Sequence, residues 1–277
     1  MTSPPRPPTP PSPLGTPAPW DLVSGAYVEE VAPVLARFAA DALAFVPLAK
    51  DAHVLDVAAG PGTLSFLAAR AGARVTAIDF SPAMIAHLRS ALEKEPGLAI
   101  DARIGDGMDL GLESGKFDAA FSMFGLIFFP DRGRGLAELA RVLRPGGRAI
   151  VSSWVPMSRA PLLAAMFGAL SKHVPMPPND GTAPLGTEAD FQREMSAAGF
   201  QDVSVREVTH GYDVPSSDEL WTSMQRSMAP VVMMKARLGS AWPAIESAVR
   251  DDLRTQLGTG PLRLDFIANL GVATRRP

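Results

Sequence analysis

Two glycines, Gly60 and Gly62, separate a short apolar run from a second run with helical character. The first run, 54–57, is rich in β-branched residues, which is typical of a buried strand in a parallel sheet. The second, 64–70, predicts a helix. A strand, a glycine turn and a helix bring backbone N–H groups and a helix N-terminus to the carboxyl edge of a sheet, where they bind an anionic or polar ligand. Glycine allows positive φ and close approach of such a ligand to the backbone.

Acidic residues follow the next two predicted strands. Asp79 ends the second strand about 17 residues after Gly62, where a carboxylate accepts hydrogen bonds from both hydroxyls of a ribose and disfavours a 2′-phosphate. Asp106, between Gly105 and Gly107, is placed to accept from an adenine amine. The alternatives are a turn-forming carboxylate at Asp79 and an Asx-turn at Asp106. Because both residues lie at one sheet edge, they predict an adenosine site.

A third carboxylate, Asp56, lies inside the first strand, two residues before the loop. It is placed to orient the loop amides or to hold a ligand ammonium group through water. A buried carboxylate satisfied only by local amides is the alternative.

Several other classes of site are excluded or disfavoured. Ser65 stands where a dinucleotide fingerprint that begins at Gly60 needs its third glycine, and no Gly-Lys-Ser/Thr follows for a P-loop. The chain has no cysteine, so it has no disulfide, thiolate metal site or thiol nucleophile, and we expect no metal. The net charge of −3 argues against nucleic acid as a partner.

Strands alternate with helices through the middle of the chain. The predicted strands are 54–57, 74–79, 99–104, 117–123, 148–154, 203–208 and 264–274. The predicted helices are 20–48, 64–70, 82–95, 131–143, 161–172, 187–198, 216–238 and 241–257. This order predicts an α/β fold with a doubly wound, Rossmann-like, mostly parallel sheet, an antiparallel last strand and helical lid insertions.

Five stretches together resemble the class I S-adenosylmethionine-dependent methyltransferases, in particular their ubiquinone/menaquinone-biosynthesis-like small-molecule group. They are 54–62, 78–84, 105–107, 117–118 and 143–147. The similarity covers about residues 48 to 154. One departure is Ala58, where the family usually has glycine. Because the backbone N–H and C=O remain, we expect a mild effect.

The resemblance implies S-adenosyl-L-methionine as the cofactor. The backbone of Ala58 and Gly60 would hold the methionine moiety, and Tyr27 would close over its carboxylate. Asp56 and Gly62 would belong to the same cofactor site. The other implied contacts are Asp79 to the ribose, Phe80 and Met84 on the adenine faces, Asp106, Gly107 and Met108 at its edge, and Ser122 and Met123 in the methyl-donor pocket. Plain packing is the alternative for Tyr27 and Met84.

Transfer from a sulfonium is an in-line displacement that depends on positioning and exclusion of water. A general base is needed only where the acceptor loses a proton. His173 and His210 are candidates, with a solvated histidine as the favoured alternative, so no catalytic residue is assigned. An apolar acceptor wall and ordinary packing stay open for four aromatic residues, Phe124, Phe128, Phe129 and Trp154.

The predicted organisation is a disordered Pro-rich tail, 1–19, and a single methyltransferase domain, 20–277. Within it, 20–48 form an N-terminal helical cover, and 156–186 and 212–260 form lid insertions. No apolar run is long enough to span a bilayer and no signal peptide is visible, so we expect a cytoplasmic protein.

We expect methyl transfer to an O, N or C atom of a small molecule, in secondary metabolism or cofactor biosynthesis, without a nucleic-acid partner. Two alternatives are a nicotinamide-dependent oxidoreductase and a cofactor-binding relative that catalyses another reaction, such as cyclisation, or none. A homodimer stays open.

Overall fold

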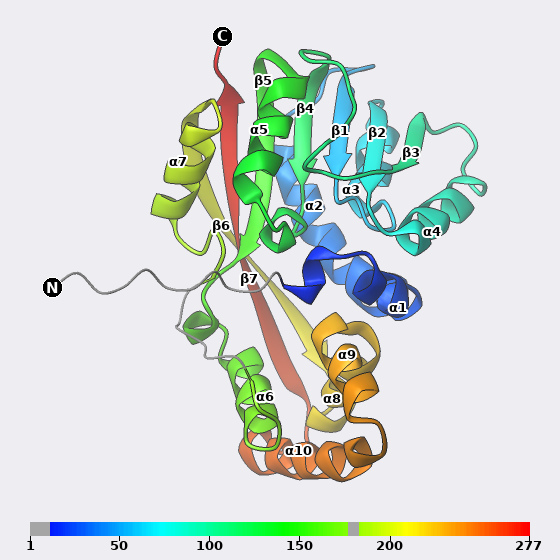
Figure 1. Ribbon diagram of the computed structural model, residues 1–277, viewed down its shortest axis with the longest axis vertical. Coiled ribbons are helices and arrows are strands. Elements are labelled where there is room, and N and C mark those ends of the chain that lie inside the picture. Colours follow the sequence, from blue (N-terminus) through cyan, green and yellow to red (C-terminus); the bar gives the residue numbers. More distant parts are fainter. Residues whose placement is uncertain (1–11, 177–182) are drawn as a thin grey trace, which may run out of the picture.

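A seven-stranded sheet in the order β3-β2-β1-β4-β5-β7-β6 forms the centre of the computed structural model, which describes residues 12–176 and 183–277 (Figure 1). The strands are β1 (His53–Val57), β2 (Arg74–Asp79), β3 (Ile100–Ile104), β4 (Phe117–Ser122), β5 (Leu143–Trp154), β6 (Phe200–Val214) and β7 (Leu262–Arg275). The first five pair in parallel, and β7 pairs antiparallel with β5 and β6. The predicted fold class is confirmed.

Helices cover both faces of the sheet because its central strands are apolar on both sides. The four residues after His53 in β1 are all buried. One face packs on α2 (Ala32–Phe45), α3 (Thr63–Arg70) and α4 (Pro82–Leu92), and the other on α5 (Arg132–Val142) and α7 (Glu188–Ala197). Crossovers between parallel strands place the turns after β1, β2 and β4 at one edge.

The N-terminal helical cover differs from the single helix predicted over 20–48. It consists of α1 (Ala18–Ala26), a π-helical turn (Tyr27–Val31) and α2. Pro33 has no N–H to donate, so the regular hydrogen-bond ladder is interrupted there, and Ala32 N–H bonds the Tyr27 carbonyl instead. Residues 1–11 of the predicted tail lie outside the described residues, but 12–19 already contain a 3₁₀ turn (Pro13–Gly15) and the start of α1.

The last two strands are longer than predicted. Trp154 at the end of β5 pairs with Ala268, which pairs with Val208 on its other side, and β6 continues for six further residues. The β6–β7 ladder therefore extends past the carboxyl ends of the parallel strands (Figure 1). The strand pattern of 203–208 covers only the middle of β6. The additional length comes from pairing with β7.

Four helices surround the far end of this ladder, and we call them the outer helical unit. They are α6 (Pro161–Ser171), α8 (Ser217–Ser227), α9 (Ala229–Leu238) and α10 (Trp242–Leu257). The helix predicted over 216–238 is two helices, because Pro230 lies in the first turn of α9. A hydrophobic cluster that includes Trp221 and Trp242 joins the unit to Val214 and Leu264 of the ladder. Its role as a lid remains a prediction.

Within the described ranges, no helix has both the length and the apolar composition that a membrane span requires.

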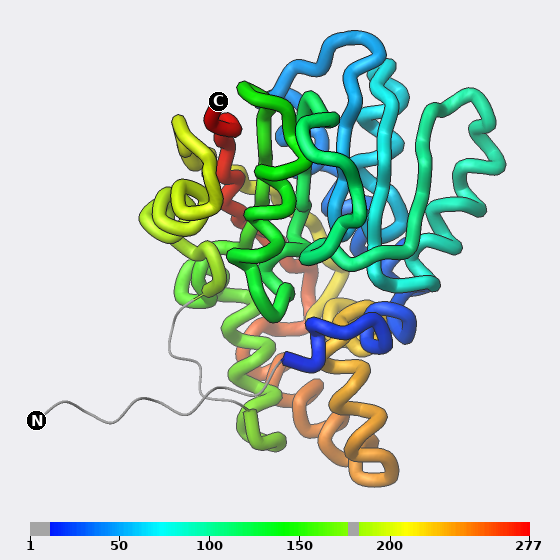
Figure 2. The backbone as a smooth tube through the Cα atoms, turned by 45° about the horizontal axis from the view of Figure 1, so that its top comes forward, coloured from blue at the N-terminus to red at the C-terminus, as the bar shows by residue number. Residues whose placement is uncertain are grey.

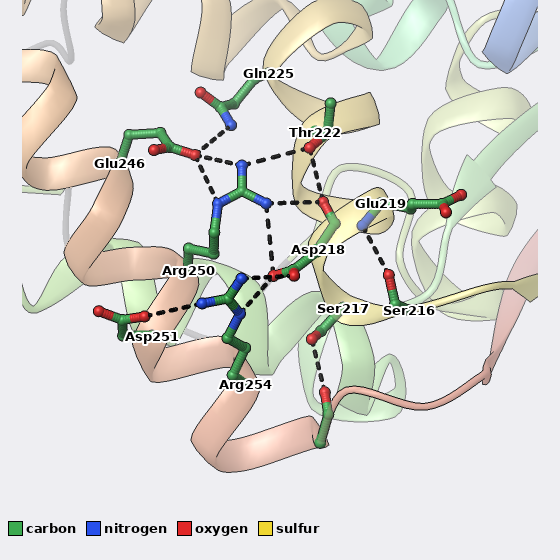
Figure 3. Close-up of polar contacts among 11 residues, drawn as sticks. Ser216, Ser217, Asp218, Glu219, Thr222, Gln225, Glu246, Arg250, Asp251 and Arg254 are labelled. Carbon is green, nitrogen blue, oxygen red and sulfur yellow. Dashed lines mark hydrogen bonds and ion pairs between the residues drawn. The ribbon is translucent and has the colours of Figure 1, made fainter.

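Asp218 in the first turn of α8 connects α8 to α10 (Figure 3). Arg254 donates to its carboxylate from Nε at 2.9 Å and from a terminal nitrogen at 2.8 Å. Arg250 donates to the Asp218 carbonyl at 3.3 Å and to Glu246 through Nε at 3.0 Å. The outer helical unit thus combines an apolar interior with an ionic network on its surface.

We expect Asp218→Asn to loosen the α8–α10 contact by about 1 kcal/mol or less, since the ion pairs are partly exposed. Amide hydrogen exchange should become faster in α8 and α10 and stay unchanged in β1 to β4. Asp251→Asn is the matched control, because Asp251 is 68% exposed and contacts Arg254 at 3.4 Å. Equal protection in the two variants would contradict the prediction.

Candidate functional site

The turn between β1 and α3 contains three residues with positive φ: Ala58 at 57°, Gly60 at 56° and Gly62 at 87°. The left-handed region costs a residue with a Cβ roughly 1–2 kcal/mol, so Ala58 is strained. A Cβ built on Gly125 would collide with the Cβ of Ala58, so the absence of a side chain at Gly125 makes room for it. Gly60 has no atom within 4 Å of its missing Cβ and opens to free space.

Asp79 connects this turn to the next crossover. One carboxylate oxygen accepts from Gly60 N–H at 2.8 Å, and the other accepts from Ser81 N–H at 2.8 Å. Ser81 is the N-cap of α4. Gly105 N–H donates to the Asp79 backbone carbonyl at 3.0 Å, which brings the segment after β3 to the same edge.

The pKa of Asp79 is raised to about 6, chiefly by burial and to a smaller extent by the nearby charge of Asp21, while the N–H groups of Ser81 and Gly60 oppose the shift. Burial also raises the pKa of Asp56 to about 7, although Asp56 accepts from the Ser65 hydroxyl at 2.6 Å. The pKa of Tyr27 is raised by burial and by the charge of Asp79. The site therefore concentrates negative charge away from water.

A cleft lies over the turn and contains five of the predicted residues, Tyr27, Asp56, Ala58, Gly60 and Met123. Its other lining residues are Leu35, Ala39, Ala59, Pro61, Thr63 and Leu64. The strand tips and the N-terminal helical cover therefore meet where the cofactor was predicted.

Other predicted residues do not line this cleft. Met84 is 2% exposed and lies in the core. Asp106 is exposed and accepts from Met108 N–H at 2.8 Å, the geometry of an Asx-turn. Gly107 packs against the ring of Phe129, while Phe80 is half-buried. Ser122 is fully buried, and its hydroxyl has no partner among the described residues. Their cofactor roles remain predictions.

Asp21 is a site residue that the sequence did not reveal. Its carboxylate accepts from the Ser81 hydroxyl at 2.5 Å and from Ala83 N–H at 3.1 Å, so it caps the N-terminus of α4 beside Asp79. Trp20 packs edge-on against Phe128 at 4.9 Å between ring centroids. Helix α1 contacts α4 on one side and the outer helices α8 and α9 on the other (Figure 2). An acidic residue on a predicted helix carries no local signal for such a contact.

No group of acidic, histidine or cysteine side chains suited to a metal occurs in the described part of the chain.

Comparison with known proteins identifies the class. A family model described as a methyltransferase domain matches residues 54–147. The demethylmenaquinone methyltransferase of Thermobifida fusca is 33% identical over 174 residues, which cover 57% of this chain and 72% of that protein. Together with the fold and the Asp79 turn, this match shows that the chain belongs to the class I S-adenosylmethionine-dependent methyltransferases.

Two further likenesses are more limited. An uncharacterised protein of Mycobacterium tuberculosis is 41% identical over 104 residues, and this match spans only 38% of that protein's length and 38% of this chain. The solved structure of the [4+2]-cyclase SpnF superposes with a TM-score of 0.59 at 21% identity, over 96% of this chain and 98% of that one. This second likeness shows the fold alone.

The raised pKa of Asp79 predicts how stability depends on pH. Between about pH 4 and 6 the folded protein keeps a proton on Asp79 that the unfolded chain has lost, so the free energy of unfolding falls as pH rises through this window. The contribution is on the order of 3 kcal/mol at most. Urea unfolding of the free protein between pH 4.5 and 7.5 measures the slope. Asp79→Asn should reduce the slope and leave the part that comes from Asp56, while Asp101→Asn, at an exposed position, should leave the whole slope unchanged.

The Ala58–Gly125 contact predicts a compensating pair. We expect Gly125→Ala to lower the free energy of unfolding by about 1–3 kcal/mol, because its Cβ collides with Ala58. Ala58→Gly alone should be neutral or stabilising, since it relieves the positive φ. The double variant should recover most of the loss, with a coupling energy of about 0.5–3 kcal/mol in a denaturation cycle. Additive effects would show that the two residues do not meet.

Proposed function

We propose that this protein transfers the methyl group of S-adenosylmethionine to an O, N or C atom of a small molecule. The observation that carries the proposal is the Asp79 carboxylate, which is fixed by Gly60 and Ser81 N–H groups at the carboxyl ends of β1 and β2. Family membership supports the same reaction.

The residues that line the cleft, and the carboxylates beside it, fit this cofactor. The fixed carboxylate accepts hydrogen bonds, and a ribose offers two hydroxyl donors. The open space over Gly60 allows a ligand to approach the backbone. Asp56, Asp79 and Asp21 supply negative charge, which favours a ligand that carries an ammonium group and a sulfonium.

S-adenosylmethionine supplies an electrophilic methyl group on a positively charged sulfur. The protein's contribution is then to position the methyl donor and the acceptor and to exclude water. In well-oriented systems, positioning lowers the activation free energy by on the order of 7–11 kcal/mol. The turn at Ala58 and Gly60 would hold the methionine moiety and Tyr27 would close over its carboxylate. Asp79 would hold the ribose, and Met123 would lie at the reacting end.

A role in secondary metabolism or cofactor biosynthesis is the narrower form of the proposal. The relative from Thermobifida fusca, named for demethylmenaquinone, supports a small-molecule acceptor. A cofactor-binding protein that catalyses another reaction, such as cyclisation, is the alternative.

Calorimetry tests the cofactor. The purified protein should bind S-adenosylmethionine and S-adenosylhomocysteine and should not bind NAD. Asp79→Ala should weaken both ligands by about tenfold or more, because hydrogen bonds to a charged group contribute about 1.5–3 kcal/mol. Glu113→Gln, on an exposed loop, is the matched control.

Mass spectrometry of a cell-extract metabolite pool incubated with methyl-labelled cofactor tests the reaction. A labelled small molecule supports methyl transfer. Binding without any labelled product, across extracts, favours the alternative, and absence of binding by the unmodified protein overturns the proposal.

A further inference from the structure

An aromatic group lies beside the cleft, at the ends of β4 and β5. Phe124 stacks on Trp154 with ring centroids 4.0 Å apart and planes 19° apart. Phe38 of α2 meets Phe124 edge-on at 5.5 Å, and Phe266 of β7 meets Trp154 at 5.8 Å. Trp154 and Phe266 are only partly buried, so the group presents aromatic surface rather than a closed core.

His210 borders this group and is paired with a carboxylate. Its Nε2 lies 2.6 Å from a carboxylate oxygen of Asp41, and its ring meets Phe38 edge-on at 4.6 Å. The side chain of His210 is 16% exposed. Because an ionised carboxylate only accepts, Nε2 carries the hydrogen, and Nδ1 of the neutral ring keeps its lone pair. Within the described residues, no hydrogen bond occupies Nδ1.

The same two elements line both the cleft and the aromatic group. Helix α2 contributes Leu35 and Ala39 to the cleft, and Phe38 and Asp41 to the region of His210. At the end of β4, Met123 lines the cleft and the next residue, Phe124, stacks on Trp154. The group therefore lies next to the reacting end of the proposed cofactor site.

His210 occupies this place because β6 extends past the sheet edge. In register, Val208 is level with Trp154, and His210 is two residues further along β6, opposite Phe266. Alternation puts Val208, His210, Phe266 and Trp154 on the same face. That face is the one covered by α2.

We propose that the acceptor is a flat, apolar aromatic ring bearing a hydroxyl group, and that His210 is the general base that deprotonates it. This inference rests on the proposed function. The acceptor O–H bond breaks as its proton moves to Nδ1 of His210. The oxygen lone pair forms the bond to the methyl carbon, and the electron pair of the broken carbon–sulfur bond stays on sulfur, which becomes a neutral thioether. Asp41 is a positioning residue that fixes the tautomer of His210 and stabilises the imidazolium.

A purely structural link between α2 and β6 is the competing explanation of the His210–Asp41 pair. The chain offers a control for it, since Arg37 also joins α2 to β6 by donating to the Gly211 carbonyl at 2.8 Å. Arg37→Met removes a neighbouring link between the same elements but no proton acceptor.

The test compares two acceptors of different acidity, 2-naphthol, which is protonated at neutral pH, and 4-nitro-1-naphthol, which ionises more readily. His210→Ala should reduce methyl transfer to 2-naphthol by about 10²–10⁴-fold, as expected for loss of a general base, and have a much smaller effect with the nitro compound. Added imidazole should restore part of the activity. Asp41→Asn should show the same contrast to a smaller degree. Arg37→Met should affect both acceptors equally.

Calorimetry with S-adenosylhomocysteine present gives a readout independent of turnover. 2-Naphthol should still bind His210→Ala and should bind Trp154→Ala more weakly. Equal losses on both naphthols, or the same contrast in Arg37→Met, would overturn the assignment of the base. If the unmodified protein binds S-adenosylmethionine but neither binds nor methylates the naphthols, the acceptor class is wrong and the proposed function stands. Failure to bind S-adenosylmethionine would instead remove the proposed function itself.

Discussion

The site depends on one buried residue, Asp79, that joins three strand ends of the sheet. Asp79 accepts from the turn after β1 through Gly60 and from the start of α4 through Ser81, and its own carbonyl accepts from Gly105 after β3. Each bond comes from a backbone N–H, so Asp79 fixes the path of the backbone rather than the position of another side chain. Its carboxylate holds the ends of β1 and β2, and its backbone carbonyl holds the end of β3.

Holding this carboxylate ionised is unfavourable in the free protein, which explains its raised pKa. Asp21 caps the same helix N-terminus, and Asp56 lies nearby with its own pKa raised by burial. Positive helix ends and backbone N–H groups compensate only part of the repulsion and desolvation. A cationic ligand with hydroxyl donors would supply the rest, so the protein stores a destabilised site that its proposed ligand stabilises.

Local sequence signals predicted the parallel strands, the glycine turn and the position of Asp79. Strand ends, glycines and N-caps determine the conformation of the backbone only within a few neighbouring residues. Contacts between distant segments left no such signal. Asp21 reaches α4, and Gly125 makes room for the Cβ of Ala58, only because the folded chain brings them together. The extension of β6 to Val214 likewise comes from pairing with β7 and from packing of the outer helical unit, which a short apolar pattern does not encode.

The extended β6–β7 ladder gives this fold a second wall that the parallel strands alone cannot build. Parallel strands end at the cofactor edge, and their tips can contribute only the residues of their own turns. A ladder that continues past this edge carries side chains such as His210 and Phe266 beyond the strand tips, where the proposed acceptor would bind. Helix α2 closes the angle between the two walls, since it contacts the cleft through Ala39 and the ladder through Asp41. In the proposed arrangement β6 and β7 add side chains to the acceptor surface alone, whereas α2 and the end of β4 contribute to both surfaces, so acceptor choice and cofactor binding share part of their framework.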